Sequence, residues 1–130
     1  MKLVVDEPGS GEVRRTAKGA DSLAAAGLAY VEWRAALARM RAGGRLTQRA
    51  HDDAAADLDG IWADIASVSA DDPLIEHAAL LAERYLLRAY DAVHLAAALK
   101  VAAEAATRFA CWDGDLRAAA EAEGLDVAPL

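Results

Sequence analysis

Three acidic residues stand where the sequence predicts structure that would turn a carboxylate away from bulk water. Glu32 lies within one predicted helix, Asp91 lies near the start of another, and Asp113 directly follows the apolar run Phe109–Trp112. An ionised carboxylate out of water is costly unless it is paired or binds a metal. Oxygen ligands from separate elements are what Mg²⁺ and Mn²⁺ prefer. The chemistry that these three residues indicate is therefore binding of a hard cation.

Glu32 lies on the apolar side of the helix predicted over Leu28–Ala42. At about 100° per residue, it points about 160–180° away from Arg34 and Arg41, which we expect to face solvent. Arg39 follows seven residues later on nearly the same line. The alternative to a metal ligand is a partly buried contact of Glu32 with Arg39 or with the backbone.

Asp91 lies nearly opposite Lys100 and Glu104, which mark the solvent side of the helix predicted over Ala89–Ala106. It also falls in the first helical turn, where the helix dipole favours a negative charge. A simple helix-start aspartate is therefore the alternative to a ligand. His94, one turn later, has two alternative roles: it lines the same site as Asp91, or it is a structural residue.

Asp113 follows a predicted buried strand, Thr107–Trp112. Ligands bind at the carboxyl ends of the strands in parallel α/β sheets. Asp115 heads the next predicted helix, so we expect Asp115 to be its N-cap. Asp113 has no comparable local role, which favours a functional one. Cys111 has no base arranged beside it and is expected to be a small core residue.

The elements that would position these acids alternate between helices and strands. Helices are predicted over Glu12–Lys18, Leu28–Ala42, Thr47–Ala66 with Thr47 as N-cap, Asp72–Tyr85 with Pro73 in the first turn, Ala89–Ala106 and Asp115–Glu123. Strands are predicted over Ser22–Ala26, Ala66–Ala70, Thr107–Trp112 and Leu125–Pro129. This alternation predicts an α/β sandwich with a mostly parallel sheet, in a single domain over residues 1–130.

The composition fits one folded domain and excludes several classes of protein. The chain has 130 residues, of which 55% are hydrophobic, and this excludes a disordered chain. No apolar stretch approaches the ~20 residues of a membrane span. A single cysteine cannot form an internal disulfide, so we expect a cytoplasmic protein. Residues 1–50 hold nine Lys and Arg against five Asp and Glu, whereas residues 51–130 hold five against sixteen. Nucleic-acid binding would therefore have to be local.

Several segments of this sequence resemble those of PIN-domain proteins, specifically the VapC-type toxins of bacterial toxin–antitoxin pairs. They are Leu28–Glu32, Arg88–Ala96, Phe109–Asp113 and, in a turn, Val5–Ser10. The resemblance covers essentially the whole chain. It implies a PIN-like three-layer α/β/α sandwich and a Mg²⁺- or Mn²⁺-dependent endoribonuclease, in which a metal-activated water attacks an RNA phosphodiester.

Carried over residue by residue, the resemblance makes Glu32, Asp91 and Asp113 catalytic metal ligands, with Asp115 as an auxiliary ligand. This sequence departs from the family at its N-terminal end. Family members begin with an apolar strand that ends in an Asp followed by Thr or Ser, and this Asp is a metal ligand. Here Met1–Val5 aligns with the helix after that strand, so the first strand and the first acidic ligand are absent.

Two explanations of this departure are open. Either the recorded chain starts at an internal codon of a longer protein, or the protein is an inactive PIN-like binding module that dimerises or binds an antitoxin. An alanine-rich helical interaction protein without a metal site is a more distant alternative. Asp6 does not replace the first ligand, because it matches a surface turn.

The resemblance also implies an RNA substrate, a cognate antitoxin and a homodimer, with no membrane association. RNA would need cationic contacts near an acidic site, and the basic half of the chain offers candidates. The arginines considered for phosphate binding are Arg14, Arg15, Arg39 and Arg45. Trp33, Trp62 and Trp112 are expected either to stack on bases or to anchor the core.

Overall fold

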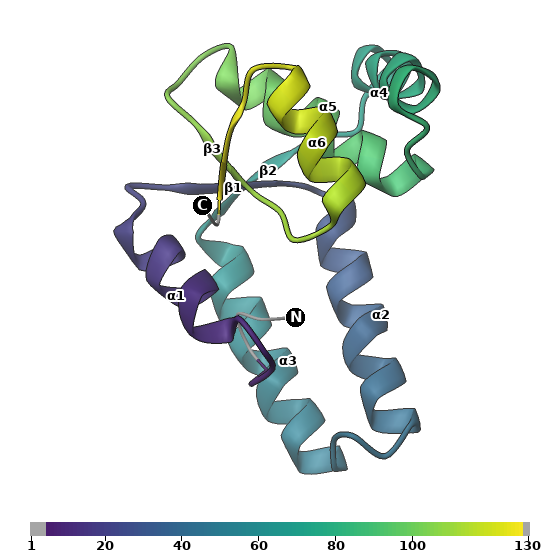
Figure 1. Cartoon of the computed structure of the whole chain (residues 1–130). Helices are drawn as coiled ribbons and strands as arrows, with labels where there is room; N and C mark the ends of the chain where they lie inside the picture. Colours follow the sequence, from purple (N-terminus) through teal and green to yellow (C-terminus); the bar gives the residue numbers. More distant parts are fainter. Residues whose placement is uncertain (1–4, 129–130) are drawn as a thin grey trace. The chain divides into compact units, whose positions relative to one another are not determined.

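The structure is a computed structural model that describes residues 5–128. Within that range the chain is mixed α/β and mostly helical. Its elements, labelled in Figure 1, are α1 (Ser10–Gly19), β1 (Leu23–Ala26), α2 (Leu28–Ala42), α3 (Gln48–Ala63), β2 (Ile65–Val68), α4 (Asp72–Tyr85), α5 (Ala89–Ala102), β3 (Arg108–Ala110), α6 (Gly114–Ala122) and β4 (Asp126–Ala128). The part of Met1–Val5 that falls on residues 1–4 lies outside the described residues, as does Pro129.

Local signals set the helix starts. The Thr47 hydroxyl accepts a hydrogen bond from the Ala50 amide at 3.1 Å, which confirms Thr47 as the N-cap of α3. The Asp71 carboxylate likewise accepts from the Leu74 amide at 3.1 Å and caps α4, with Pro73 in the first turn. Among the described helices, none is long and apolar enough to cross a membrane.

Two helices end earlier than predicted. α3 stops at Ala63, and α5 stops at Ala102 rather than at Ala106. The alanines from 103 to 106 flank Glu104 and are exposed. A further helical turn there would bury no apolar face, and packing of such a face supplies most of a helix's stability.

The chain divides into two compact units. Unit 1 comprises residues 1–23 and 28–66, and in its described part α2 and α3 pack side by side (Figure 1). Their contact is built on the buried side chains Leu37, Ala54, Ala55 and Leu58. The Trp33 and Trp62 rings meet edge to face, with centroids 5.8 Å apart. These two tryptophans therefore anchor the unit 1 core, the second of their two expected roles.

Arg41 is exposed and the Arg34 side chain is 41% exposed, as expected for the solvent side of α2, and both arginines also contact α3. Arg34 lies 3.3 Å from the Asp59 carboxylate, and Arg41 donates a hydrogen bond to Gln48 at 3.3 Å. The long side chains reach across because α3 returns alongside α2 and presents polar groups to them.

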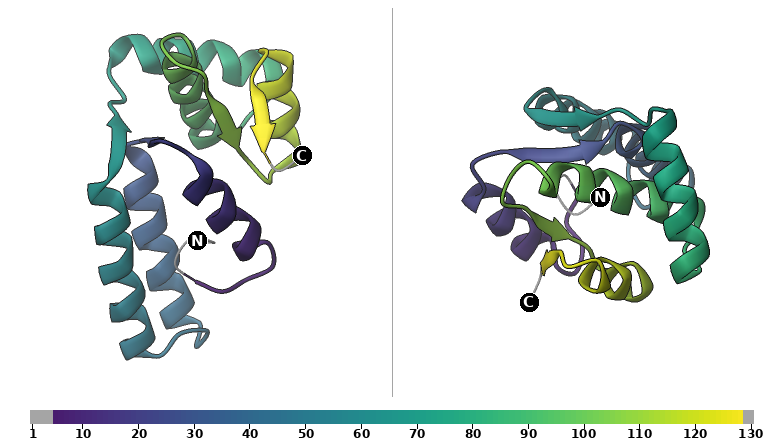
Figure 2. Two further views of the ribbon diagram at one scale, coloured as in Figure 1. Left: turned by 90° about the vertical axis from the view of Figure 1, so that its left-hand side faces the viewer. Right: turned by 90° about the horizontal axis from the view of Figure 1, so that it is seen from above.

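Unit 2 comprises residues 24–27 and 67–130, described to residue 128. α4 packs against α5, and Figure 2 shows α6 leading into β4 beside β3. The core of this unit centres on Leu81, Leu95 and Ala120, which are at most 1% exposed. Alanine supplies much of this core, since Ala26, Ala78, Ala92, Ala96, Ala97, Ala119 and Ala120 are all buried in it.

The strands form two small sheets within the described residues. β3 pairs with β4 in parallel, with Phe109 opposite Val127, and β1 pairs with β2. The prediction of a buried strand over Thr107–Trp112 was wrong: β3 covers Arg108–Ala110, whose outer two residues are exposed. A strand of a two-stranded sheet keeps one open edge, so its burial is incomplete. The three-layer sandwich stays a prediction.

Candidate acidic site

Asp91 and Asp113 meet at one guanidinium group in unit 2. The Arg88 Nε atom donates to Asp91 Oδ2 at 2.9 Å, and Arg88 Nη2 lies 3.5 Å from Asp113 Oδ2. Asp91 comes from the first turn of α5, and Asp113 from the loop between β3 and α6. Folding therefore brings together two of the three predicted acids, which are 22 residues apart in the sequence.

Asp91 is the more protected of the two acids. Its side chain is 19% exposed, against 44% for Asp113. It lies in the first turn of α5, as the helix-start alternative predicts, and it pairs with Arg88, the N-cap residue of the same helix. Its role as a metal ligand stays a prediction. His94, one turn later, is half-buried.

Asp113, and not Asp115, is the N-cap of α6. Its Oδ1 atom accepts a hydrogen bond from the Leu116 amide at 3.0 Å, and the helix starts at Gly114. The expectation that Asp115 would be the N-cap was wrong, as was the expectation that Asp113 has no local role. The helix begins one residue earlier than predicted, because the backbone at Asp113 is already in the extended conformation of an N-cap.

The two oxygens of Asp113 thus have different partners. Oδ1 satisfies a backbone amide of α6, whereas Oδ2 faces Arg88 and Asp91. Asp115 is exposed in the first turn of the same helix.

Arg88 responds electrostatically to all three aspartates. Its pKa is raised above the ordinary value, first by the hydrogen bond to Asp91, then by attraction to Asp91 and to Asp113, with a smaller contribution from Asp115. The predicted role of Asp115 as an auxiliary ligand stays a prediction.

Cys111 is a buried residue beneath the acidic loop. Its side chain donates a weak hydrogen bond to the Asp113 carbonyl at 3.5 Å, and only 5% of the residue is exposed. Burial, more than any other influence, raises the pKa of the Cys111 thiol, and the nearby Asp113 and Asp91 charges raise it further. A protonated, buried thiol is a poor nucleophile, in agreement with the predicted core role.

Glu32 belongs to unit 1, where it is half-buried on α2, while Arg39 is exposed. The role of Glu32 as a further metal ligand stays a prediction. In residues 5–128, no group of three or more His, Cys, Asp or Glu side chains is placed to hold a metal ion. Among the predicted ligands, the geometry therefore brings together only the carboxylates of Asp91 and Asp113 within the described residues.

The candidate RNA-binding residues are also in unit 1. Arg15, Arg39 and Arg45 are exposed, whereas Arg14 forms an ion pair of 2.6 Å with Asp6 in the turn before α1. Asp6 is 89% exposed, which agrees with its assignment to a surface turn. Trp112 is 42% exposed in the loop next to Asp113 and is not part of a buried strand.

The sequence interpretation missed Arg88. Its spacing of three residues before Asp91, at the start of a predicted helix, is a recognised distance for a side-chain ion pair. Its contact with Asp113 has no such local signal, because that contact depends on the packing of α5 beside the loop after β3.

Comparison with known proteins agrees with the motifs. No family model matches the chain. Ribonuclease VapC45 of Mycobacterium tuberculosis strain CDC 1551 is 38% identical to it over 129 residues, an alignment that covers 99% of this chain and 89% of the relative. Ribonuclease VapC49 of M. tuberculosis strain H37Rv gives the same values. The chain belongs to the VapC family of PIN-domain toxins. The acid pair of unit 2 is thus formed by two motifs that carry the resemblance to VapC proteins.

Proposed function

We propose that this protein is a Mg²⁺- or Mn²⁺-dependent endoribonuclease that acts as the toxin of a toxin–antitoxin pair. The observation that supports the proposal is the convergence of Asp91 and Asp113 on one positive charge. Both relatives described above are named ribonucleases, which indicates the substrate class.

The residues present fit a hard cation. Mg²⁺ needs only one or two protein carboxylates, because water and substrate phosphate complete its coordination. Asp91 and Asp113 supply two carboxylates that both contact the Arg88 guanidinium, and both lie at helix N-termini. Glu32 and Asp115 are the proposed further ligands.

The chain's own residues have defined roles in this proposal. Asp91 and Asp113 would hold the cation. A divalent ion bound there would supply an acidic water and offset the charge that builds on the phosphate. Cys111 takes no covalent part, because its thiol is buried and its pKa is raised. Exposed Arg15, Arg39 and Arg45 are proposed as phosphate contacts.

The proposal includes the family's fold and partners. We infer a three-layer PIN-like sandwich and a cytoplasmic location. We also infer two protein partners, a second copy of this chain and an antitoxin. Leu80, Leu86 and Tyr90 are at least 61% exposed in unit 2, and exposed apolar side chains of this size are common at protein interfaces.

The test is metal-dependent cleavage of single-stranded RNA by the purified protein. Asp91→Asn is expected to lower cleavage by about 100-fold or more in Mg²⁺ or Mn²⁺, because a metal ligand is lost. Asp126→Asn is the matched control, since Asp126 forms an equivalent 2.9 Å ion pair with Arg108 away from the proposed ligands.

Metal binding is measured separately from cleavage. Mn²⁺ at ten times its Kd should stabilise the fold by about 1.4 kcal/mol, and Asp91→Asn should abolish this gain. Absence of both Mn²⁺ stabilisation and RNA cleavage in the wild-type protein would refute the proposal and favour a binding module without catalysis.

A further inference from the structure

Arg88 is a surface side chain held at a specific place. It is the N-cap residue of α5, but its side chain makes no capping hydrogen bond. The side chain is 78% exposed and nevertheless contacts two carboxylates from different elements. Fixing a long exposed side chain costs conformational entropy. The combined attraction of the two acids explains why it is held there.

The guanidinium contacts both carboxylates that we propose as metal ligands. Two different nitrogens of Arg88 face Oδ2 of Asp91 and Oδ2 of Asp113. The other oxygen of Asp113, Oδ1, accepts from the Leu116 amide. Two cationic groups in contact repel each other. A metal ion and Arg88 therefore compete for the same pair of acids.

A displaced Arg88 would remain close to the bound phosphate. Its exposure shows that solvent surrounds most of the side chain, so it can swing away without unfolding the core. The guanidinium stays charged and has a planar set of donors that matches phosphate oxygens. RNA binding places a phosphate at the metal and gives Arg88 a new anionic partner within reach.

We propose that Arg88 is a substrate-binding residue, which occupies the acid pair in the metal-free protein and transfers to the RNA phosphate when the metal binds. This inference rests on the proposed function. In the metal-free protein, Arg88 offsets the repulsion between Asp91 and Asp113. In the loaded protein, it contributes one phosphate contact.

Metal affinity gives the first test. We would measure Mn²⁺ binding by calorimetry for the wild-type protein, Arg88→Gln and Arg88→Lys. Arg88→Gln should bind Mn²⁺ about three- to tenfold more tightly, because the competing charge is gone. Arg88→Lys should lie between the two, since lysine keeps the charge but loses the two-nitrogen fork.

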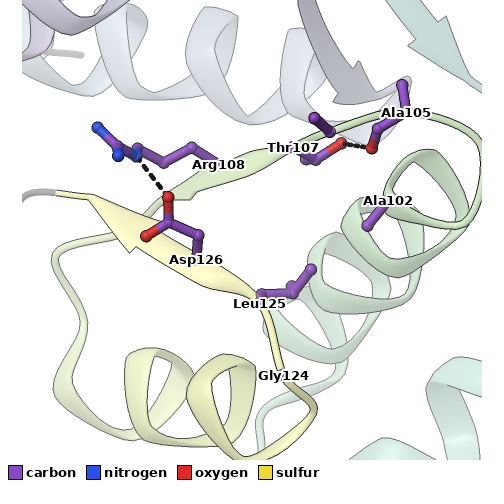
Figure 3. A pocket seen from close by; sticks show the side chains of 8 residues that line it. Ala102, Ala105, Thr107, Arg108, Gly124, Leu125 and Asp126 are labelled. Carbon is purple, nitrogen blue, oxygen red and sulfur yellow. Dashed lines mark hydrogen bonds and ion pairs between the residues drawn. The ribbon is translucent and has the colours of Figure 1, made fainter.

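Arg108→Gln is the matched control. The Arg108 Nε atom lies 2.9 Å from Asp126 Oδ2, the same atoms and distance as in the Arg88–Asp91 pair (Figure 3). Its Mn²⁺ affinity should equal that of the wild-type protein. Unfolding midpoints of all variants check that folding is preserved, and Arg88→Lys keeps the test valid if Arg88→Gln does not fold.

RNA binding gives the second test. With saturating Mn²⁺ and a single-stranded RNA oligonucleotide, Arg88→Gln should raise KM by about tenfold and change kcat little, because a phosphate contact is lost. The slope of log affinity against log salt should fall by about 0.7. Unchanged or weaker Mn²⁺ affinity, or an unchanged KM, would overturn the role of Arg88.

The outcomes also separate this inference from the proposed function. If the wild-type and Arg88→Gln proteins bind Mn²⁺ with equal affinity and Asp91→Asn binds none, the metal site is supported and the role of Arg88 is refuted. If none of the proteins binds Mn²⁺, both proposals fail. Mn²⁺ binding by the wild-type protein that is tighter in Arg88→Gln and lost in Asp91→Asn would support both.

Discussion

Asp113 combines a structural role and a proposed functional role in one side chain, and substitutions can separate them. Its Oδ1 atom caps α6 and its Oδ2 atom faces Arg88. Asparagine keeps an oxygen for the Leu116 amide but removes the charge. Alanine removes the oxygen and the charge together. Asp113→Asn and Asp113→Ala should therefore differ in stability and agree in metal binding.

The structure sets the size of the difference. Replacing an N-cap by alanine costs about 1 kcal/mol, in a range of about 0.5–2, whereas asparagine caps about as well as aspartate. The ion pair with Arg88 is long at 3.5 Å and joins exposed side chains, so it adds less than about 1 kcal/mol. Its loss is partly offset, because the repulsion between Asp113 and Asp91 also disappears. Asp113→Asn should be within about 0.5 kcal/mol of the wild-type protein and Asp113→Ala about 1–2 kcal/mol below it.

Urea unfolding with and without Mn²⁺ measures both effects. Asp71 is the matched control, because it caps α4 through the same type of hydrogen bond at 3.1 Å and is similarly exposed, at 46% against 44%. Asp71→Ala should lose about 1 kcal/mol and keep the full Mn²⁺ response. Both Asp113 variants should lose that response.

Two results would refute this reasoning. Equal destabilisation by Asp113→Asn and Asp113→Ala would show that the capping oxygen does not account for the stability of this loop. A full Mn²⁺ response in Asp113→Asn would show that Asp113 is not a ligand, and the acid pair would then not be the metal site.

Three further predictions concern unit 2. Leu86 is the C-cap of α4, with a φ of +54°, and it is 90% exposed. Leu86→Gly should therefore raise the free energy of unfolding by up to about 1 kcal/mol, as measured by the urea midpoint. Destabilisation would show that the leucine side chain contributes a contact. The Tyr85 hydroxyl donates to Glu123 at 2.6 Å and, with Arg84, lowers the pKa of Glu123 below its ordinary value of 4.5. This carboxylate therefore stabilises the fold above about pH 4.5, and the gain is lost as the pH falls through the lowered pKa. Glu123→Gln should flatten that part of the curve of unfolding free energy against pH. An unchanged curve would contradict the lowered pKa of Glu123. Because burial raises the pKa of Cys111, iodoacetamide at pH 7.5 should label the native protein slowly and the urea-unfolded protein at least about tenfold faster, whereas equal rates would contradict its burial.

Much of the secondary structure could be predicted because its signals are local. α2 and α4 have the predicted bounds, since Gly43–Gly44 end the first and Asp71 with Pro73 starts the second. Thr47 was recognisable as a cap for the same reason. Predictions failed where burial decides the outcome: β3 is shorter than the strand predicted over Thr107–Trp112, and only β4 pairs with it in the described sheet.

The candidate site shows the same division. We predicted Asp115 as the N-cap of α6 and no local role for Asp113, but the helix starts one residue earlier and Asp113 caps it. Arg88 was missed because its contact with Asp113 joins residues 25 positions apart. No short-range pattern predicts which charged group will meet such a pair.

The sequence by itself determined the family and the bounds of α2 and α4, because caps, turns and motifs act over a few neighbouring residues. Tertiary structure decided that Asp91 and Asp113 meet, that one oxygen of Asp113 caps a helix, and that Arg88 spans the pair. These facts depend on how α5 packs beside the loop after β3. Charged groups interact through space, so their partners are fixed only when the core places their backbones.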